Sequence, residues 1–180
     1  LDRSSAASDV YKRQQHGGIL VDFNAVKGGI EIIPLDNDWQ RAAHVYSDEV
    51  LISHRTDAEK GTPKFERGKS LSDHQQEMIY ISGTAAIRGE ESIVTGDVLV
   101  QTEITLENIQ HLIGLEEGRE KLPEHSGKLE LLRVYLKHEE DAKIVKEDMD
   151  KLCPDVPIVY LYADVCREEL LVEIEGIAYL

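Results

Sequence analysis

Alternating apolar and polar positions near the carboxyl end predict the strand around which the chain is organised. In residues 170–178, aliphatic side chains at every second position share one face, and Glu173 and Glu175 fall on the other, which is the period of a half-buried β-strand. Carboxylates among apolar side chains cost free energy unless water, hydrogen-bond donors or protonation compensate. From the strand alone, two hydrated surface glutamates are the favoured interpretation, and a functional site is the alternative.

A second apolar segment, residues 156–165, precedes this strand and leads into a turn that carries Cys166, Arg167 and two glutamates. We expect the two segments to pair as an antiparallel hairpin joined through residues 166–169. The thiol, the guanidinium and the carboxylates would then meet near one edge of the sheet. Such a group can bind a carboxylate and donate a proton.

The same alternation predicts further strands. The strand over residues 77–86 ends in small and hydroxyl-bearing side chains at positions 82–85, which let a ligand approach the backbone closely; a tight turn or bulge explains them equally well. In the strand over residues 129–137, Arg133 is a cation interleaved among apolar residues, which a satisfied surface charge explains. The other predicted strands are residues 18–23 and 29–35, with a turn at Gly28-Gly29 between them.

Apolar residues that recur every three to four positions predict two helices. The first begins at Asp97, a natural N-cap, and continues to about Ile113. Gln101 and Asn108 fall near its buried edge, where structural hydrogen bonding explains them better than catalysis does. The second helix, residues 139–152, begins with three acidic residues, which are favourable at the positive end of a helix dipole.

Segments rich in charge, glycine and proline, residues 57–71 and 115–128, are interpreted as connections rather than core. From Met78 onward the element order is β-α-β-α-β-β. Strands separated by helices predict an α/β sandwich, in which a mixed sheet has two helices packed on one face.

We expect one domain and no internal repeat. Residues 1–14 are polar and aperiodic; they resemble translated sequencing-adaptor read-through, and a native disordered tail is the alternative. Residues 15–76 are interpreted as a partial N-terminal segment and residues 77–180 as the core.

Charge and cysteine usage exclude several classes of function. The net charge of −15 over 180 residues argues against non-specific binding of nucleic acid or anionic membranes. No apolar run approaches the ~20 residues that span a bilayer, and no secretory signal pattern is present. Cys153 and Cys166 lack metal-type spacing and the seven histidines are scattered. We therefore expect reduced thiols, a cytoplasmic location and no bound metal.

The strand end at residues 81–83, the helix at residues 96–109 and the strands at residues 133–136 and 171–178 resemble the RidA/YjgF superfamily, over a span from Met78 to Ala178. More narrowly, the chain is similar to the chorismatases, which carry a YjgF-like core, from about Leu35 to the end. Residues 81–92 resemble the chorismatase block S-G-T-A-S-I-x-G-H-E-S, and residues 163–167 resemble A-D-I-C-R. The remaining matches are residues 37–46, residues 63–67, and the closing Glu-x-Glu-Gly strand.

The resemblance implies an activity on chorismate without a cofactor. A glutamic acid, Glu173 or alternatively Glu175, would protonate the enolpyruvyl methylene group. Water would then attack the oxocarbenium ion, and the hemiketal would collapse to pyruvate and a dihydroxycyclohexadiene carboxylate; other family members form a hydroxybenzoate. Burial on an apolar strand would supply the raised pKa that such an acid needs.

The resemblance also implies residues that bind the substrate. Cys166 would position it, and arginines would hold its carboxylates, which a guanidinium can bind bidentately. Position 85 holds alanine rather than glycine, and in this respect the chain resembles the hydrolytic branch of the family. The implied substrate-binding residues are Cys166, Arg67, Tyr46, Arg133, Gly83, Thr84 and Ala85.

The chain departs from the family pattern at several positions. Glu90 stands where the family has histidine, His44 where it has an aromatic residue, and Asp38-Trp39 replace Pro-Arg. Much of the N-terminal part of full-length chorismatases has no counterpart, so we expect a truncated fragment whose activity the resemblance leaves open.

Two other functions remain as alternatives. RidA-like imine deaminases use an arginine on the strand before the glutamate strand, and the corresponding residue here is Ile158. A non-catalytic ligand-binding module of the same fold is the second alternative, because fold does not fix function. A dry cleft joining Arg67, Cys166 and Glu173 would favour the enzyme, and an open, hydrated sheet face would favour the module. YjgF-like cores often form homotrimers with sites between subunits, and such an assembly is open to this chain.

Overall fold

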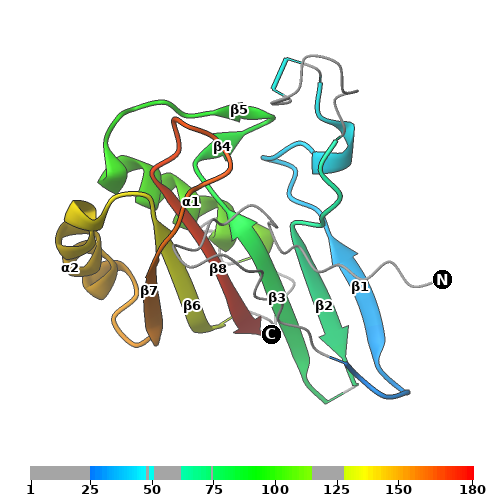
Figure 1. Cartoon of the computed structure of the whole chain (residues 1–180). Coiled ribbons are helices and arrows are strands. Elements are labelled where there is room, and N and C mark those ends of the chain that lie inside the picture. The colour runs from blue at the N-terminus through cyan, green and yellow to red at the C-terminus, as the bar shows by residue number, and fades with distance from the viewer. Residues whose placement is uncertain (1–24, 48, 51–61, 74, 115–127) are drawn as a thin grey trace.

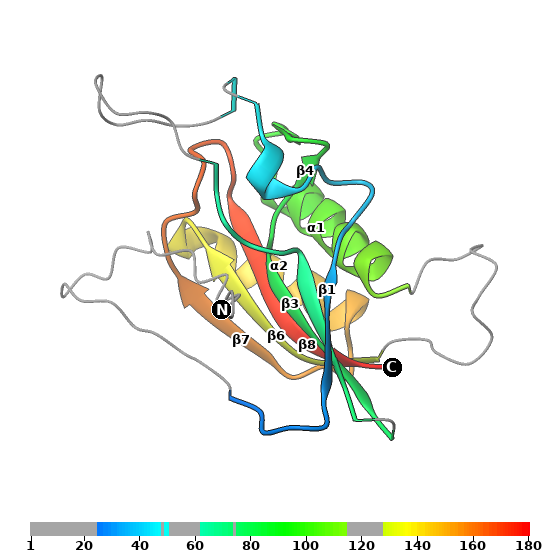
Figure 2. The same cartoon turned by 90° about the vertical axis from the view of Figure 1, so that its right-hand side faces the viewer.

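The computed structural model describes residues 25–47, 49–50, 62–73, 75–114 and 128–180. These residues form a six-stranded mixed sheet with helices packed on one of its faces (Figures 1 and 2), as predicted. The strand order is β1-β2-β3-β8-β6-β7. The strands are β1 (Glu31–Leu35), β2 (Gly68–Ser72), β3 (Glu77–Thr84), β6 (Lys128–Leu136), β7 (Ile158–Tyr162) and β8 (Val172–Tyr179), the helices are α1 (Val98–Leu112) and α2 (Ala142–Leu152), and a small hairpin consists of β4 (Ile87–Arg88) and β5 (Glu91–Ser92).

The closing strand β8 lies inside the sheet, between β3 and β6, and is antiparallel to both. The predicted hairpin between β7 and β8 is wrong, because β6 separates them. Parallel strands need a crossover connection, and α2 supplies it between β6 and β7, which pair in parallel. β7 therefore occupies the edge of the sheet, and both edges of β8 are paired, one with β3 and the other with β6.

The segment predicted as a connection contains a strand. Gly68–Ser72 forms β2, which pairs with β1 on one side and β3 on the other, so the prediction is wrong there. Residues 68–72 include a single large apolar residue, Leu71, and show no alternation that could reveal a strand. Strands β1 and β2 thus extend the same sheet as the rest of the chain. The predicted strand at 18–23 and the tail at 1–14 lie outside the described residues.

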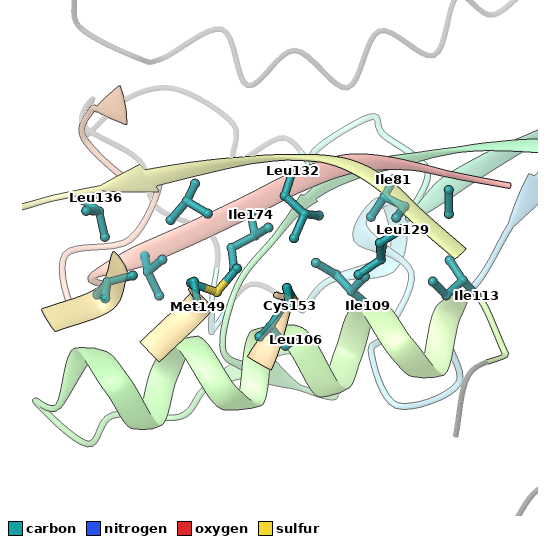
Figure 3. Packing of buried hydrophobic residues seen from close by; sticks show 14 of the residues in the cluster. Ile81, Leu106, Ile109, Ile113, Leu129, Leu132, Leu136, Met149, Cys153 and Ile174 are labelled. Carbon is teal, nitrogen blue, oxygen red and sulfur yellow. The ribbon is translucent and has the colours of Figure 1, made fainter. Parts of the chain in front are cut away.

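The hydrophobic core lies between the sheet and the two helices (Figure 3). One face of β6 and one face of β8 supply fully buried aliphatic side chains, as their alternation predicted. Helix α2 contributes Val145 and Met149, whereas Leu152 at its carboxyl end is 44% exposed. Burying each large aliphatic side chain stabilises the fold by roughly 1.5–3 kcal/mol. The labelled members of the cluster are Ile81, Leu106, Ile109, Ile113, Leu129, Leu132, Leu136, Met149, Cys153 and Ile174.

Helix α1 begins at the predicted cap and fastens two loops to the sheet. The Asp97 carboxylate accepts hydrogen bonds from the backbone N–H groups of the first turn. Gln101 bonds the backbone on both sides of Leu170, by donating to Glu169 O (2.9 Å) and accepting from Leu171 N (2.8 Å). Asn108 donates to Ala85 O and Ile87 O, both at 3.0 Å. The prediction of a structural role for these two amides is confirmed. Within the described residues, no helix is long and apolar enough to cross a membrane.

Candidate functional site

Glu173 lies on the face of the sheet opposite the helices and is only 3% exposed. Its carboxyl group sits against Gly83 of β3. A Cβ at position 83 would overlap Glu173 Oε1 and lie 2.9 Å from Cδ, so a glycine leaves the space that the carboxyl group occupies. The register of β3 against β8 shifts between Ile81 and Thr84. The prediction of a bulge at positions 82–85 is therefore confirmed, and the protein's own glutamate occupies the space beside Gly83. Ligand approach to this backbone stays a prediction.

This contact predicts the outcome of a double-mutant cycle. Gly83→Ala should lower the free energy of unfolding by ~1–3 kcal/mol, because the added methyl group overpacks the Glu173 carboxyl. In the Glu173→Ala background the same substitution should cost at least ~0.5 kcal/mol less, since the obstructing atoms are gone. Urea denaturation of the four proteins measures both values. Equal costs in the two backgrounds would show that Gly83 and Glu173 do not meet.

Glu175 is two residues further along β8, and its carboxylate is hydrogen-bonded to side chains of β6. Its Oε1 accepts hydrogen bonds from Arg133 Nη1 (2.9 Å) and from the Tyr135 hydroxyl (2.5 Å). Burial raises the pKa of Tyr135, and the hydrogen bond to Glu175 raises it further, so the phenol keeps the proton that it donates. Strand register places Arg133 opposite Glu175, and Tyr135 opposite Glu173. Arg133, a predicted substrate-binding residue, thus uses one amino group on Glu175.

Arg67 and Tyr46 are brought together, as a shared role requires. Arg67 is 3% exposed, and its Nη2 donates to the Tyr46 hydroxyl (2.5 Å) and to Arg41 O (2.8 Å). Its guanidinium carbon lies 5.1 Å from the centre of the Phe65 ring. Arg67 O accepts a hydrogen bond from Ser82 N (3.1 Å), so the backbone of Arg67 lies directly beside the residue that precedes Gly83.

Cys166 is exposed in the loop between β7 and β8. Two apolar residues of this loop, Val165 and Leu170, pack with residues 85–87, which follow β3. The loop therefore lies at the same end of the sheet as the β4–β5 hairpin (Figure 1). Thr84 uses its hydroxyl inside this turn, where it donates to Ser82 O at 2.9 Å.

Two residues of this region were not among the substrate-binding residues that the resemblance implied, although Arg167 was expected beside Cys166 in a group that can bind a carboxylate. Arg167 is 8% exposed and donates from Nη1 to Glu90 O (2.8 Å) and Ser92 Oγ (3.0 Å). Its position directly after Cys166, in a segment that resembles a family block, was the available signal. The Glu90 carboxylate accepts hydrogen bonds from Ser47 Oγ (2.6 Å) and Ser47 N (2.8 Å), which lower the pKa of Glu90. The sequence showed that Glu90 stands where the family has histidine, but it did not indicate that Ser47 would be its hydrogen-bond partner.

A surface hollow of about 400 Å³ lies elsewhere, near the start of α1 and beside α2. Asp97, His138 and Leu171 are among its lining residues, and none of the predicted site residues lines it. Across the parts of the chain that the structure describes, no group of three or more His, Cys, Asp or Glu side chains could hold a metal ion.

No family model matches the chain, but individual proteins do. A chorismatase of Streptomyces rapamycinicus is 32% identical over 169 residues, which cover 89% of this chain and 47% of that protein. A 3-hydroxybenzoate synthase of Streptomyces hygroscopicus is 36% identical over 128 residues, or 64% of this chain and 36% of that protein. The chain thus spans about half the length, or less, of these curated relatives.

Solved structures agree with this relationship. A crystal structure of a chorismatase superposes with a TM-score of 0.66 at 27% identity, covering 82% of this chain and 43% of that one. The Rid-family protein YyfA of Yersinia pestis superposes with a TM-score of 0.50 at 15% identity, covering 71% and 96%, which shows a shared fold alone. The chain is therefore a homologue of the chorismatases over about half of their length, and it has a RidA/YjgF-like fold.

Proposed function

We propose that this protein converts chorismate, without a cofactor, to pyruvate and either a dihydroxycyclohexadiene carboxylate or a hydroxybenzoate. The observation that carries the proposal is the placement of Glu173. It is a buried carboxyl group on the sheet face opposite α1 and α2, and it touches Gly83. The residue before Gly83 is bonded to the backbone of Arg67, whose side chain is paired with Tyr46. The relatives named chorismatase and 3-hydroxybenzoate synthase support the same substrate.

In the proposed reaction Glu173 is the general acid. Its carboxyl O–H gives a proton to the methylene carbon of the enolpyruvyl group, and the electron pair of the C=C bond forms the new C–H bond. The carbon next to the ether oxygen becomes an oxocarbenium ion, to which water adds with loss of a proton. The hemiketal then collapses, its C–O bond to the ring oxygen breaks, and that oxygen takes up a proton to leave pyruvate and the ring diol.

The burial of Glu173 suits this role better than the surroundings of Glu175. Burial disfavours the ionised form of a carboxyl group, and Glu173 is the more buried of the two glutamates. Glu175 is more exposed, with 21% of its side chain accessible, and it forms an ion pair with Arg133. We therefore assign the acid role to Glu173, and we assign to Glu175 the task of holding Arg133 and Tyr135 on the same sheet face.

The substrate is anionic and the chain carries a net charge of −15, so binding must rely on local cations. Screening confines the repulsion between distant charges to about 8 Å at physiological ionic strength. A guanidinium can bind a carboxylate through two parallel hydrogen bonds. We propose that Arg67, oriented by Tyr46, binds one substrate carboxylate, and that Gly83, Thr84, Ala85, Cys166 and Arg133 line the site.

Incubation of the purified protein with chorismate tests the proposal. Pyruvate release is followed by coupling to lactate dehydrogenase, and the ring products are separated by chromatography. Pyruvate with a ring diol would place the chain in the hydrolytic branch, which Ala85 suggests, and pyruvate with a hydroxybenzoate would place it beside the 3-hydroxybenzoate synthase. Calorimetric binding of chorismate without pyruvate release would support a ligand-binding module instead. A RidA-like deaminase is disfavoured by the aliphatic Ile158 on β7.

We also propose that the chain forms a homotrimer through the sheet face opposite α1 and α2. Val159 and Leu161 alternate on β7 with residues that pack against the core, and they are 46% and 37% exposed. Apolar side chains exposed together on a sheet favour burial between subunits. Sedimentation velocity should give a particle of three times the chain mass, and Leu161→Glu should dissociate it. Ile144→Glu, on exposed α2, is the matched control; a monomer in the unmodified protein would contradict the assembly.

A further inference from the structure

Two buried guanidinium groups flank the ring of Tyr46. The Cζ of Arg67 lies 5.8 Å from the ring centre and the Cζ of Arg167 lies 5.4 Å from it, within the range of cation–π attraction. The two arginines are 3% and 8% exposed. Neither forms an ion pair with a carboxylate in the described part of the chain. They come from segments that are distant in the sequence: Arg67 directly precedes β2, and Arg167 lies in the loop before β8.

Arg167 also reaches Tyr46 by a second route. Its Nη1 donates to Glu90 O and Ser92 Oγ, which fixes the β4–β5 hairpin against the loop before β8. The Glu90 carboxylate in turn accepts hydrogen bonds from both the backbone and the hydroxyl of Ser47, the residue next to Tyr46. Arg167 therefore constrains Tyr46 in two ways. It lies over the Tyr46 ring, and through Glu90 it holds the backbone of Ser47, the next residue.

Arg67 has a buried donor that could serve a ligand. Its Nη2 is engaged by Tyr46 and by Arg41 O. Its Nε is buried, and among the described residues it has no hydrogen-bond acceptor. A buried donor without an acceptor is costly, and a carboxylate that accepts from it removes that cost. The direction of this N–H depends on how the guanidinium is turned, which the Tyr46 hydroxyl helps to set.

We propose that Arg167 is a positioning residue that orients the Tyr46–Arg67 pair for binding the substrate carboxylate. The inference rests on the proposed function for the identity of the substrate. Arg167 itself uses Nη1 within the protein, so it acts through Tyr46 and through the Glu90–Ser47 contact. Lysine in its place would keep the charge beside the ring, but it lacks the planar guanidinium that can donate to two acceptors in fixed directions.

The first test is independent of turnover. The Nε–H resonance of Arg67 is recorded by ¹H–¹⁵N NMR in the unmodified protein and in Arg167→Met, Arg167→Lys and Arg88→Met, and Arg67→Lys assigns the signal. Arg88 is the matched control, because it is an arginine of the same hairpin that packs over Trp39 rather than Tyr46. We expect the resonance to shift or broaden in Arg167→Met, to recover in part in Arg167→Lys, and to stay in place in Arg88→Met.

The second test measures KM and kcat for chorismate in the same variants. Loss of an oriented carboxylate contact in the ground state should raise KM about tenfold in Arg167→Met with kcat changed less than about threefold, and Arg88→Met should match the unmodified protein. An Arg67 resonance that is identical in the unmodified protein and both Arg167 variants, or a KM that stays unchanged in both, would overturn the proposal. A protein that shows the NMR shift but releases no pyruvate would refute the proposed function and retain the role of Arg167 in orienting Arg67.

Discussion

Replacing Glu173 with glutamine is expected to lower kcat for pyruvate release from chorismate by ~10²- to 10⁴-fold, the usual contribution of a general acid. Glutamine has nearly the same shape, so it fits against Gly83, but it cannot give a proton to carbon. KM should change little, because the carboxylate-binding arginine is untouched. Initial rates over a range of chorismate concentrations separate the two parameters, and circular dichroism checks that the variant folds.

Glu175→Gln is the matched control on the same strand. Glu175 accepts hydrogen bonds from Arg133 and Tyr135, and the glutamine oxygen can still accept them. We expect kcat to stay within roughly tenfold of the unmodified protein, since no proton transfer is lost. A larger loss in Glu175→Gln than in Glu173→Gln would exchange the two roles and contradict the assignment.

Leu132→Ala is expected to lower the free energy of unfolding by ~2–5 kcal/mol. Leu132 is fully buried on β6, and it packs into the space that Gly176 leaves on the neighbouring strand, where an added Cβ would lie 2.7 Å from Leu132 Cδ2. Truncation therefore removes buried apolar atoms and leaves a cavity in the layer between sheet and helices (Figure 3). Urea denaturation followed by circular dichroism measures the change.

Val94→Ala provides the comparison for Leu132→Ala. Val94 is 68% exposed in the connection before α1, and surface substitutions of this kind usually change stability by less than about 0.5 kcal/mol. If Leu132→Ala were no more destabilising than Val94→Ala, the core could not lie where the structure places it.

The elements of the core could be predicted from the sequence because each carries its own local pattern. Alternation in residues 129–137 identified the buried face of β6, and Asp97 marked the start of α1. Local patterns do not identify neighbours in a sheet. The alternation of β8 showed which face is buried, but it could not show that β6 would lie between β8 and β7.

The sequence indicated candidate residues for the site, but it did not indicate how their side chains contact one another. Arg67 stands in a charged, glycine- and proline-containing segment, which composition assigns to the surface, yet two aromatic rings and a carbonyl oxygen enclose it. The approach of Glu173 to Gly83 depends on the register shift in β3, which no local pattern reports. Arg167 was expected beside Cys166 in a group that can bind a carboxylate, but its contacts with Glu90 and Tyr46 could not be predicted, because these residues are far away in the sequence.

The origin of the new hydrogen in pyruvate tests the central claim most directly. Chorismate is incubated with the protein in D₂O, and pyruvate is trapped at once as lactate and weighed by mass spectrometry. Protonation by Glu173, whose acidic hydrogen exchanges with solvent, predicts one deuterium in the methyl group of every molecule. Pyruvate without deuterium would mean that the hydrogen came from the substrate ring, and it would contradict the account, as would the absence of pyruvate.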